Sequence, residues 1–166
     1  MRQSIRHEGD NAKNLFRKMV TNVRRSDDSS EGDTEVNIDG NWYHIDVKEC
    51  QSNTINQVRA IRYQTLVIHT YAGWYVIPPQ EVVRLAAQKS RGQHTEIPFE
   101  CANLSFNQIQ SIYWCSDSQL AERVNTAIRM GQQPQFINVK DAMDKLYSEL
   151  IKLKEQTKLS VSAIFE

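Results

Sequence analysis

The sequence contains few of the residues that build disulfide frameworks or zinc sites. Among its 166 residues are three cysteines and four histidines. The cysteines, Cys50, Cys101 and Cys115, are odd in number and widely spaced, and the absence of a CxxC pair argues against a zinc or redox motif. The histidines also lack the spacing of a zinc site. We expect the cysteines to be reduced and partly buried, and the histidines to be structural or on the surface.

Long hydrophobic runs are also missing. No stretch is both apolar enough and long enough to cross a bilayer. The residues after Met1, RQSIRHEGD, lack the apolar region of a signal peptide, so we expect a cytoplasmic protein without membrane partners. The length and the 40% hydrophobic content are sufficient for one domain, 1–166, with a hydrophobic core of its own.

The sequence has no excess of charge of one sign. Twenty basic residues balance twenty acidic ones, which on bulk electrostatics does not favour a polyanionic partner. The distribution is uneven, because the first 25 residues hold seven Lys or Arg against two acids. Residues 27–39 instead hold six acids. This acidic run is expected if some of its carboxylates bind a cation. The alternative interpretation is an ordinary solvated loop and hairpin edge.

Residues 32–51, GDTEVNIDGNWYHIDVKECQ, predict a β-hairpin. Asp39-Gly40 is a strong two-residue turn signal, because a type I′ turn needs positive φ at both central positions. The strand after the turn alternates in character with a period of two, as a half-buried strand does. Its apolar set is Tyr43, Ile45 and Val47, and its polar set is His44, Asp46 and Lys48.

The hairpin is expected to bring two carboxylates and an amine together. Asp46 and Lys48 project from the same face of their strand, and the turn folds the strand that begins near Asp33 back beside them. Hard oxygen ligands hold Mg²⁺, and a lysine beside the metal can orient or deprotonate a water and stabilise charge on a phosphate. The hairpin therefore predicts a metal site that acts on phosphates.

At these residues the sequence resembles the PD-(D/E)xK nuclease superfamily. The family motif is matched by Asp33 and by Asp46-Val47-Lys48, although Gly32 stands where a proline often precedes the first acid. The resemblance implies a restriction-endonuclease-like core, with Mg²⁺, or Mn²⁺ in its place, held by Asp33, Asp46 and the carbonyl of Val47. It implies catalytic roles for Asp33, Asp46 and Lys48, with Glu8 as the acid of the upstream helix.

Several assignments stay open at this point. Asp10 competes with Glu8, and Glu8 is also explained as an acid that stabilises a helix N-terminus. Some relatives in the superfamily have a glutamine or a basic residue just past the motif lysine, and Gln51, Gln57 and Arg59 are the counterparts here as auxiliary or DNA-contacting residues. Their alternative interpretation is a solvated helix face.

The remaining sequence predicts an α/β (α+β) fold with a mixed central sheet flanked by helices. Helices are expected over 3–20, after a cap at Thr54, and over 80–89, and strands at 66–68 and 74–77, with a loop over 21–32 and irregular structure over 90–115. Tyr113 and Trp114 are expected in the core rather than against nucleic acid. A long helix with a heptad-like apolar seam is predicted over about 138–158.

The resemblance implies a metal-dependent endonuclease that acts on double-stranded DNA near the nucleoid. Site-specific cleavage of the restriction or homing type is expected, with a Holliday-junction resolvase as the alternative. Cutting both strands usually needs two sites, so a homodimer or a larger symmetric homo-oligomer is expected, and the C-terminal helix either mediates it or packs on its own domain. In the alternative from another class, the same fold binds DNA or a protein partner without cutting, and Asp46 and Lys48 form an exposed ion pair.

Overall fold

The structure is a computed structural model that describes residues 5–27 and 34–165, with side chains described for 11–27 and 34–158. The chain separates into two compact units, residues 1–132 and residues 133–166. The second unit consists of one helix, α4 (Pro134–Phe165). None of the described helices is both long and apolar enough to span a membrane.

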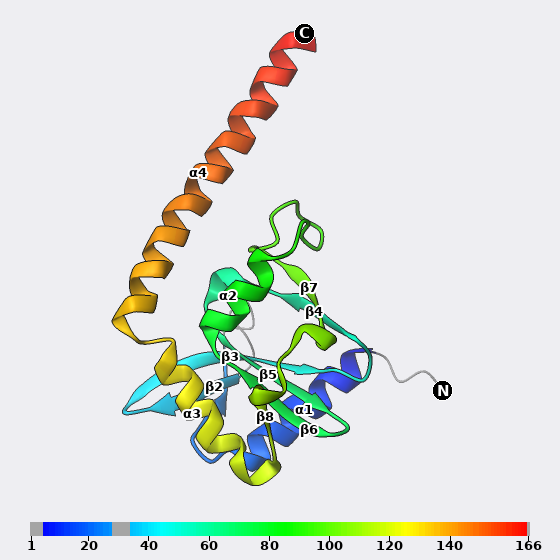
Figure 1. The fold of residues 1–166 in the computed structure, drawn as a ribbon, viewed down its shortest axis with the longest axis vertical. Helices are drawn as coiled ribbons and strands as arrows, with labels where there is room; N and C mark the ends of the chain where they lie inside the picture. Colours follow the sequence, from blue (N-terminus) through cyan, green and yellow to red (C-terminus); the bar gives the residue numbers. More distant parts are fainter. Residues whose placement is uncertain (1–4, 28–33, 166) are drawn as a thin grey trace. The chain divides into compact units, whose positions relative to one another are not determined.

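The first unit contains three helices, eight strands and several short 3-10 turns in the part of the chain that is described (Figure 1). The helices are α1 (Ile5–Met19), α2 (Pro79–Ala87) and α3 (Leu120–Met130). The strands are β1 (Val23–Arg25), β2 (Thr34–Ile38), β3 (Asn41–Glu49), β4 (Thr54–Val58), β5 (Thr65–Thr70), β6 (Gly73–Ile77), β7 (Ala102–Ser105) and β8 (Trp114–Cys115).

Six strands form the central sheet in the order β1-β2-β3-β5-β6-β8. The neighbours β3 and β5 are parallel, and every other neighbouring pair is antiparallel. A separate antiparallel pair consists of β4 and β7. The predicted mixed central sheet with flanking helices is confirmed at this level.

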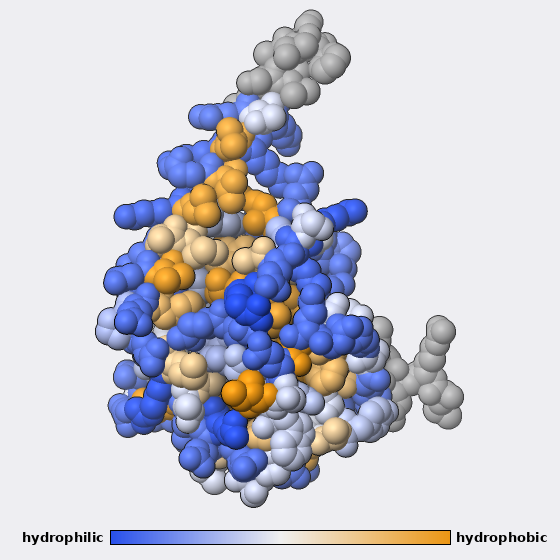
Figure 2. All heavy atoms as spheres, viewed as in Figure 1, coloured by the Kyte–Doolittle hydropathy of each residue, from blue (hydrophilic) through white to orange (hydrophobic). Residues whose placement is uncertain are grey.

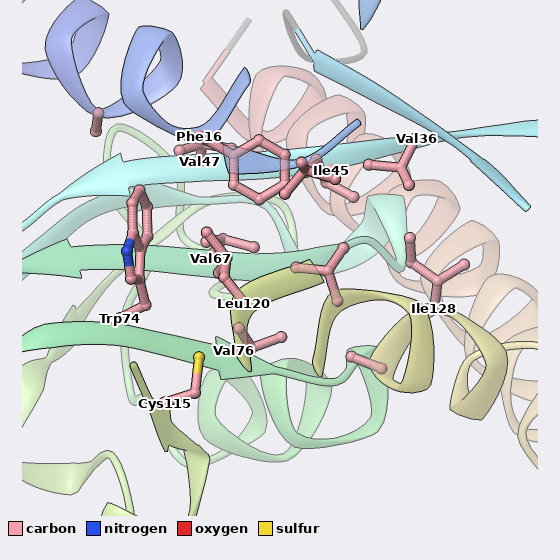
Figure 3. Packing of buried hydrophobic residues seen from close by; sticks show 14 of the residues in the cluster. Phe16, Val36, Ile45, Val47, Val67, Trp74, Val76, Cys115, Leu120 and Ile128 are labelled. Atoms are coloured by element: carbon pink, nitrogen blue, oxygen red, sulfur yellow. The ribbon is translucent and has the colours of Figure 1, made fainter. Parts of the chain in front are cut away.

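The main hydrophobic core lies between the sheet, α1 and α3. Phe16 of α1 is fully buried and contacts the ring of Trp74 edge-on, with 6.2 Å between the ring centroids. Figure 3 shows Ile45 and Val47 of β3 pointing to the same side as Phe16. The opposite face of the sheet is covered by α2 and by the β4–β7 pair (Figure 1).

The hairpin is confirmed. Asp39 and Gly40 have φ angles of 53° and 87°, and Ile38 pairs with Asn41 across the turn. The side-chain oxygen of Asn37 accepts a hydrogen bond from the amide of Gly40 at 3.2 Å. The positive φ values explain why this pair of residues ends β2, since Asp and Gly tolerate the left-handed region better than most residues.

The helix predicted after Thr54 is wrong. Residues 54–58 form β4, and only Ala60–Arg62 make a 3-10 turn. Ile55 and Val58 are spaced as on a helix, but both are buried in the β4–β7 pair, whose register shifts between them. Gln57 within this shift has a φ of 54°, which an α-helix does not accommodate.

Three further predictions need correction. The loop expected over 21–32 contains β1, which pairs with β2, and the irregular stretch over 90–115 contains β7 and β8. Helix α3 was not predicted. Trp114 is 40% exposed instead of in the core, because its indole N–H donates to the carbonyl of Ala72 at the β5–β6 turn, 2.8 Å away.

The predicted state of the cysteines is confirmed. Cys50, Cys101 and Cys115 are free thiols and are buried. Burial raises the pKa of the Cys50 and Cys115 thiols, so both stay protonated and unreactive at neutral pH.

The contact between Phe16 and Trp74 provides a test of the core. We expect Phe16→Ala to lower the free energy of unfolding by about 3–5 kcal/mol, because it removes a fully buried ring and leaves a cavity between α1 and the sheet. Tyr71→Ala is the control, because Tyr71 is 85% exposed, and its effect should stay within about 0.5–1 kcal/mol. Equal effects of the two substitutions in urea denaturation would contradict the described packing.

Candidate functional site

Asp46 and Lys48 lie next to each other on β3. Their neighbours Ile45 and Val47 are buried in the core beneath Phe16, so strand alternation directs Asp46 and Lys48 to the opposite face of the sheet. The Nζ of Lys48 lies 3.4 Å from Oδ1 of Asp46. The side chains of Asp46 and Lys48 are 25% and 26% exposed, so solvent reaches both of them, and the predicted pairing of an acid and an amine on one face is present.

A chain of hydrogen bonds holds Lys48 from the β4 side. Its Nζ donates to the carbonyl of Gln57 at 3.2 Å. The amide of Gln57 donates to the side-chain oxygen of Asn103 on β7 at 3.0 Å, and Nδ2 of Asn103 donates to Gln93 at 2.9 Å. The left-handed conformation of Gln57 therefore belongs to a segment that is tied both to Lys48 and to β7.

The other residues of the predicted metal set are only partly described. Asp33 lies outside the described residues, and so do the side chains of Glu8 and Asp10, although α1 includes both positions. The side chain of Val47 is 4% exposed and packs in the core, so only its backbone carbonyl remains as a ligand. The roles of Glu8, Asp33 and the Val47 carbonyl stay predictions.

Of the three auxiliary residues, Gln57 is the one with a described contact to Lys48. Gln57 contributes its backbone, as described above. Gln51 instead belongs to a second group, in which its side chain contacts Glu49 at 3.4 Å and accepts a hydrogen bond from the Tyr71 hydroxyl at 2.9 Å. Arg59 is exposed and precedes the 3-10 turn. Because residues 54–58 form a strand, these positions do not share a helix face.

No three His, Cys, Asp or Glu side chains form a metal-sized group in the part of the chain whose side chains are described. The predicted ligand set includes Asp33, which is outside that part. Among the predicted metal ligands, Asp46 is the one whose carboxylate is described. Its oxygens are of the hard type that Mg²⁺ and Mn²⁺ prefer.

Two carboxylate–histidine contacts that were not predicted from the sequence lie on opposite faces of the sheet, and only the contact of Glu35 with His44 shares the face of Asp46 and Lys48. Glu35 of β2 pairs in register with His44 of β3, and its carboxylate lies 3.2 Å from Nε2 of His44. In the same way Glu49 pairs with His69 of β5, with 2.8 Å between Nδ1 and the carboxylate. The two-residue turn at Asp39-Gly40 fixes the hairpin register and so sets Glu35 opposite His44. The contact of Glu49 with His69 depends instead on the parallel register of β3 and β5, which sequence spacing does not give.

The carboxylate of Glu35 is held by two further hydrogen bonds. Its carboxylate accepts hydrogen bonds from Nε of Arg24 at 2.6 Å and from the hydroxyl of Ser26 at 3.1 Å. The bond from Arg24 is the main reason why the pKa of Glu35 lies below its ordinary value, against the opposing effect of burial. Arg24 also stacks on Trp42, with 3.8 Å from its guanidinium carbon to the ring centroid.

No protein-family model, curated protein or solved structure matches this chain. The assignment of a function therefore depends on the local chemistry of β3 and its neighbours, together with the motif in the sequence.

The lowered pKa of Glu35 predicts how stability changes with pH. A carboxyl group whose pKa is depressed on folding stabilises the protein above its unfolded pKa, about 4.5, and this contribution is lost as the pH falls through the folded pKa. We expect Glu35→Gln to cost about 1–2 kcal/mol at pH 7, since charge-assisted hydrogen bonds contribute about 1.5–3 kcal/mol and Arg24 is half exposed.

The difference between wild type and Glu35→Gln should shrink as the pH is lowered below about 4.5. Urea denaturation between pH 7 and pH 3.5 measures it, with Glu155→Gln, at an exposed position within α4, as a matched control that shows no such trend. A difference for Glu35→Gln that is independent of pH would show that the carboxylate charge is not what stabilises this corner of the sheet.

Proposed function

We propose that the chain is a metal-dependent endonuclease that hydrolyses phosphodiester bonds of double-stranded DNA. The observation that carries the proposal is the pair of Asp46 and Lys48 on one face of β3, with 3.4 Å between Nζ and Oδ1. This pair lies on the second strand of a hairpin whose first strand follows Asp33 in the sequence. The combination of an acid and a lysine two residues apart on such a strand supports the PD-(D/E)xK resemblance.

In this proposal Asp46 and Asp33 hold Mg²⁺ with the Val47 carbonyl, and Glu8 completes the set directly or through a water. When bound, Mg²⁺ polarises the scissile phosphate and neutralises charge on the leaving 3′-oxygen. The side chain of Lys48 positions the attacking water and stabilises the charge that builds up on the phosphate. Its bond to the carbonyl of Gln57 limits where the ammonium group can lie, which favours one orientation toward a bound phosphate.

The substrate class within the proposal is duplex DNA cut at specific sites, as restriction and homing enzymes do. A junction-resolving enzyme is the alternative with the same chemistry. Preferential cutting of a four-way junction over a linear duplex of the same sequence would favour the resolvase, whereas discrete fragments from linear DNA would favour the site-specific enzymes.

A non-catalytic role is the competing proposal, and one observation favours it. Lys48 donates to the carbonyl of Gln57, so the lysine also ties β3 to β4 as a structural residue would. The two accounts differ in what Lys48→Met changes, because a structural tie affects the free energy of unfolding and a catalytic lysine affects cleavage.

Substitution of the pair tests the proposed nuclease. We expect Asp46→Asn and Lys48→Met each to lower metal-dependent cleavage about 10³-fold, because each removes a charge that acts on the reacting phosphate. The assay is cutting of a mixed plasmid and genomic DNA library with Mg²⁺ or Mn²⁺. The controls Asp141→Asn and Lys145→Met make the same chemical changes at exposed positions of α4 and should cut like wild type.

Full cleavage by both Asp46→Asn and Lys48→Met would contradict the assigned site. Full cleavage by Lys48→Met together with a lower midpoint of urea denaturation would instead assign Lys48 the structural role.

Asn103 is expected to act as a positioning residue for Lys48. Its side-chain oxygen accepts the Gln57 amide, and its Nδ2 binds Gln93. Asn103→Asp keeps the acceptor for Gln57, whereas Asn103→Leu removes it. We expect Asn103→Leu to lower kcat about tenfold with KM for DNA little changed, and Asn103→Asp to recover most of that loss. Equal kcat values for the two variants would show that the bond to Gln57 does not position Lys48.

A further inference from the structure

Helix α4 carries a row of exposed apolar side chains. Val139, Leu146, Leu150 and Leu153 are each between 41% and 59% exposed, and Met143 between them is partly exposed. They follow one another at steps of four, three, four and three residues. In Figure 2 hydrophobic side chains gather along one side of α4 among hydrophilic ones. Such a row is an interaction surface, because exposed leucines at this spacing share one side of a helix.

The spacing is that of a coiled-coil seam. Met143 and Leu150 take the a positions of the heptad, and Val139, Leu146 and Leu153 take the d positions. Leucine at the d positions, here Leu146 and Leu153, matches two-stranded coiled coils, whereas the a positions hold Met143 and Leu150 in place of the β-branched residues typical of such coils. The seam therefore matches a second helix of the same kind better than it matches a flat partner.

The charges beside the seam distinguish the two orientations of such a pair. Glu149 takes a g position and Lys154 the e position five residues later. In a parallel, in-register coil, a g residue faces the e residue of the next heptad on the other helix, so Glu149 of each copy meets Lys154 of the other. In an antiparallel coil e faces e and g faces g. The e positions are Lys140, Tyr147 and Lys154, so no opposite charges would meet there.

At the g positions, too, no opposite charges would meet in an antiparallel coil. They are Ala142, Glu149 and Gln156, and a pairing of g with g brings glutamate against glutamate or against an uncharged residue. The charges thus favour the parallel orientation over the antiparallel one.

We propose that residues 139–153 of α4 pair with the same residues of a second copy of this chain as a parallel, in-register, two-stranded coiled coil. Both helices then begin at the same end, so the two N-terminal units are attached at the same end of the coil. The proposal does not depend on the proposed nuclease, and it is tested without DNA. If the nuclease is correct, the coil supplies the two sites that cutting both strands of a duplex requires.

Reversal of the two charges tests the proposal. In sedimentation equilibrium at low salt over a range of concentrations, we expect wild type to dimerise reversibly, because the seam covers only about two heptads. Glu149→Lys and Lys154→Glu should each weaken the dimer about tenfold, since either change places like charges opposite each other twice. The matched control is Glu155→Lys, an f position of α4 away from the seam, and it should dimerise like wild type.

Two combinations make the test specific for the parallel register. The double variant Glu149→Lys/Lys154→Glu should regain the wild-type affinity, because it exchanges the two charges of each pair. An equimolar mixture of the two single variants should form heterodimers, since each copy then supplies one sign at both positions. A wild-type monomer at all concentrations, or a dimer in which the double variant stays as weak as the singles, would overturn the proposal.

Discussion

The burial of Ile45 and Val47 on one face of β3 is the constraint on which the candidate site depends. Both side chains lie in the core with Phe16 of α1, at 1% and 4% exposure. A strand cannot bury two residues at i and i+2 without turning the residues beside them to its other face. Asp46 and Lys48 are therefore fixed on the same side by packing energy rather than by their own weak ion pair, which contributes little at such exposure.

The parallel pairing of β3 with β5 explains why β4 lies over the sheet face that bears Asp46 and Lys48. A parallel pair needs a crossover connection, and here the connection carries β4 across the sheet face that bears Asp46 and Lys48. The irregular register of β4 presents the carbonyl of Gln57 to Lys48. The lysine is thereby held between its own strand and the crossover, and Asn103 supports the crossover from β7.

The sequence was sufficient to predict the features that follow from local patterns. The Asp39-Gly40 turn, the alternation along β3 and the helix after two prolines all depend on neighbouring residues. Local patterns did not predict that residues 54–58 form a strand. The buried apolar residues of β4 are three apart, and they are buried by β7, about fifty residues away in the sequence. The contact of Glu49 with His69 was missed for the same reason, since only the parallel register of β3 and β5 brings the two side chains together. The contact of Glu35 with His44, in contrast, follows from the two-residue turn of the hairpin and was overlooked. The metal set stays a prediction at Glu8 and Asp33, whose side chains lie outside the described residues.

The proposed role of Asp46 as a metal ligand beside Lys48 can be tested by titration calorimetry with Mn²⁺. We expect the wild-type chain to bind Mn²⁺ at one site and Asp46→Asn to abolish this binding, while Asp141→Asn, on the exposed surface of α4, leaves it unchanged. Mn²⁺ binding of equal strength in wild type and Asp46→Asn, or no binding by the wild-type chain, would show that Asp46 is not a metal ligand.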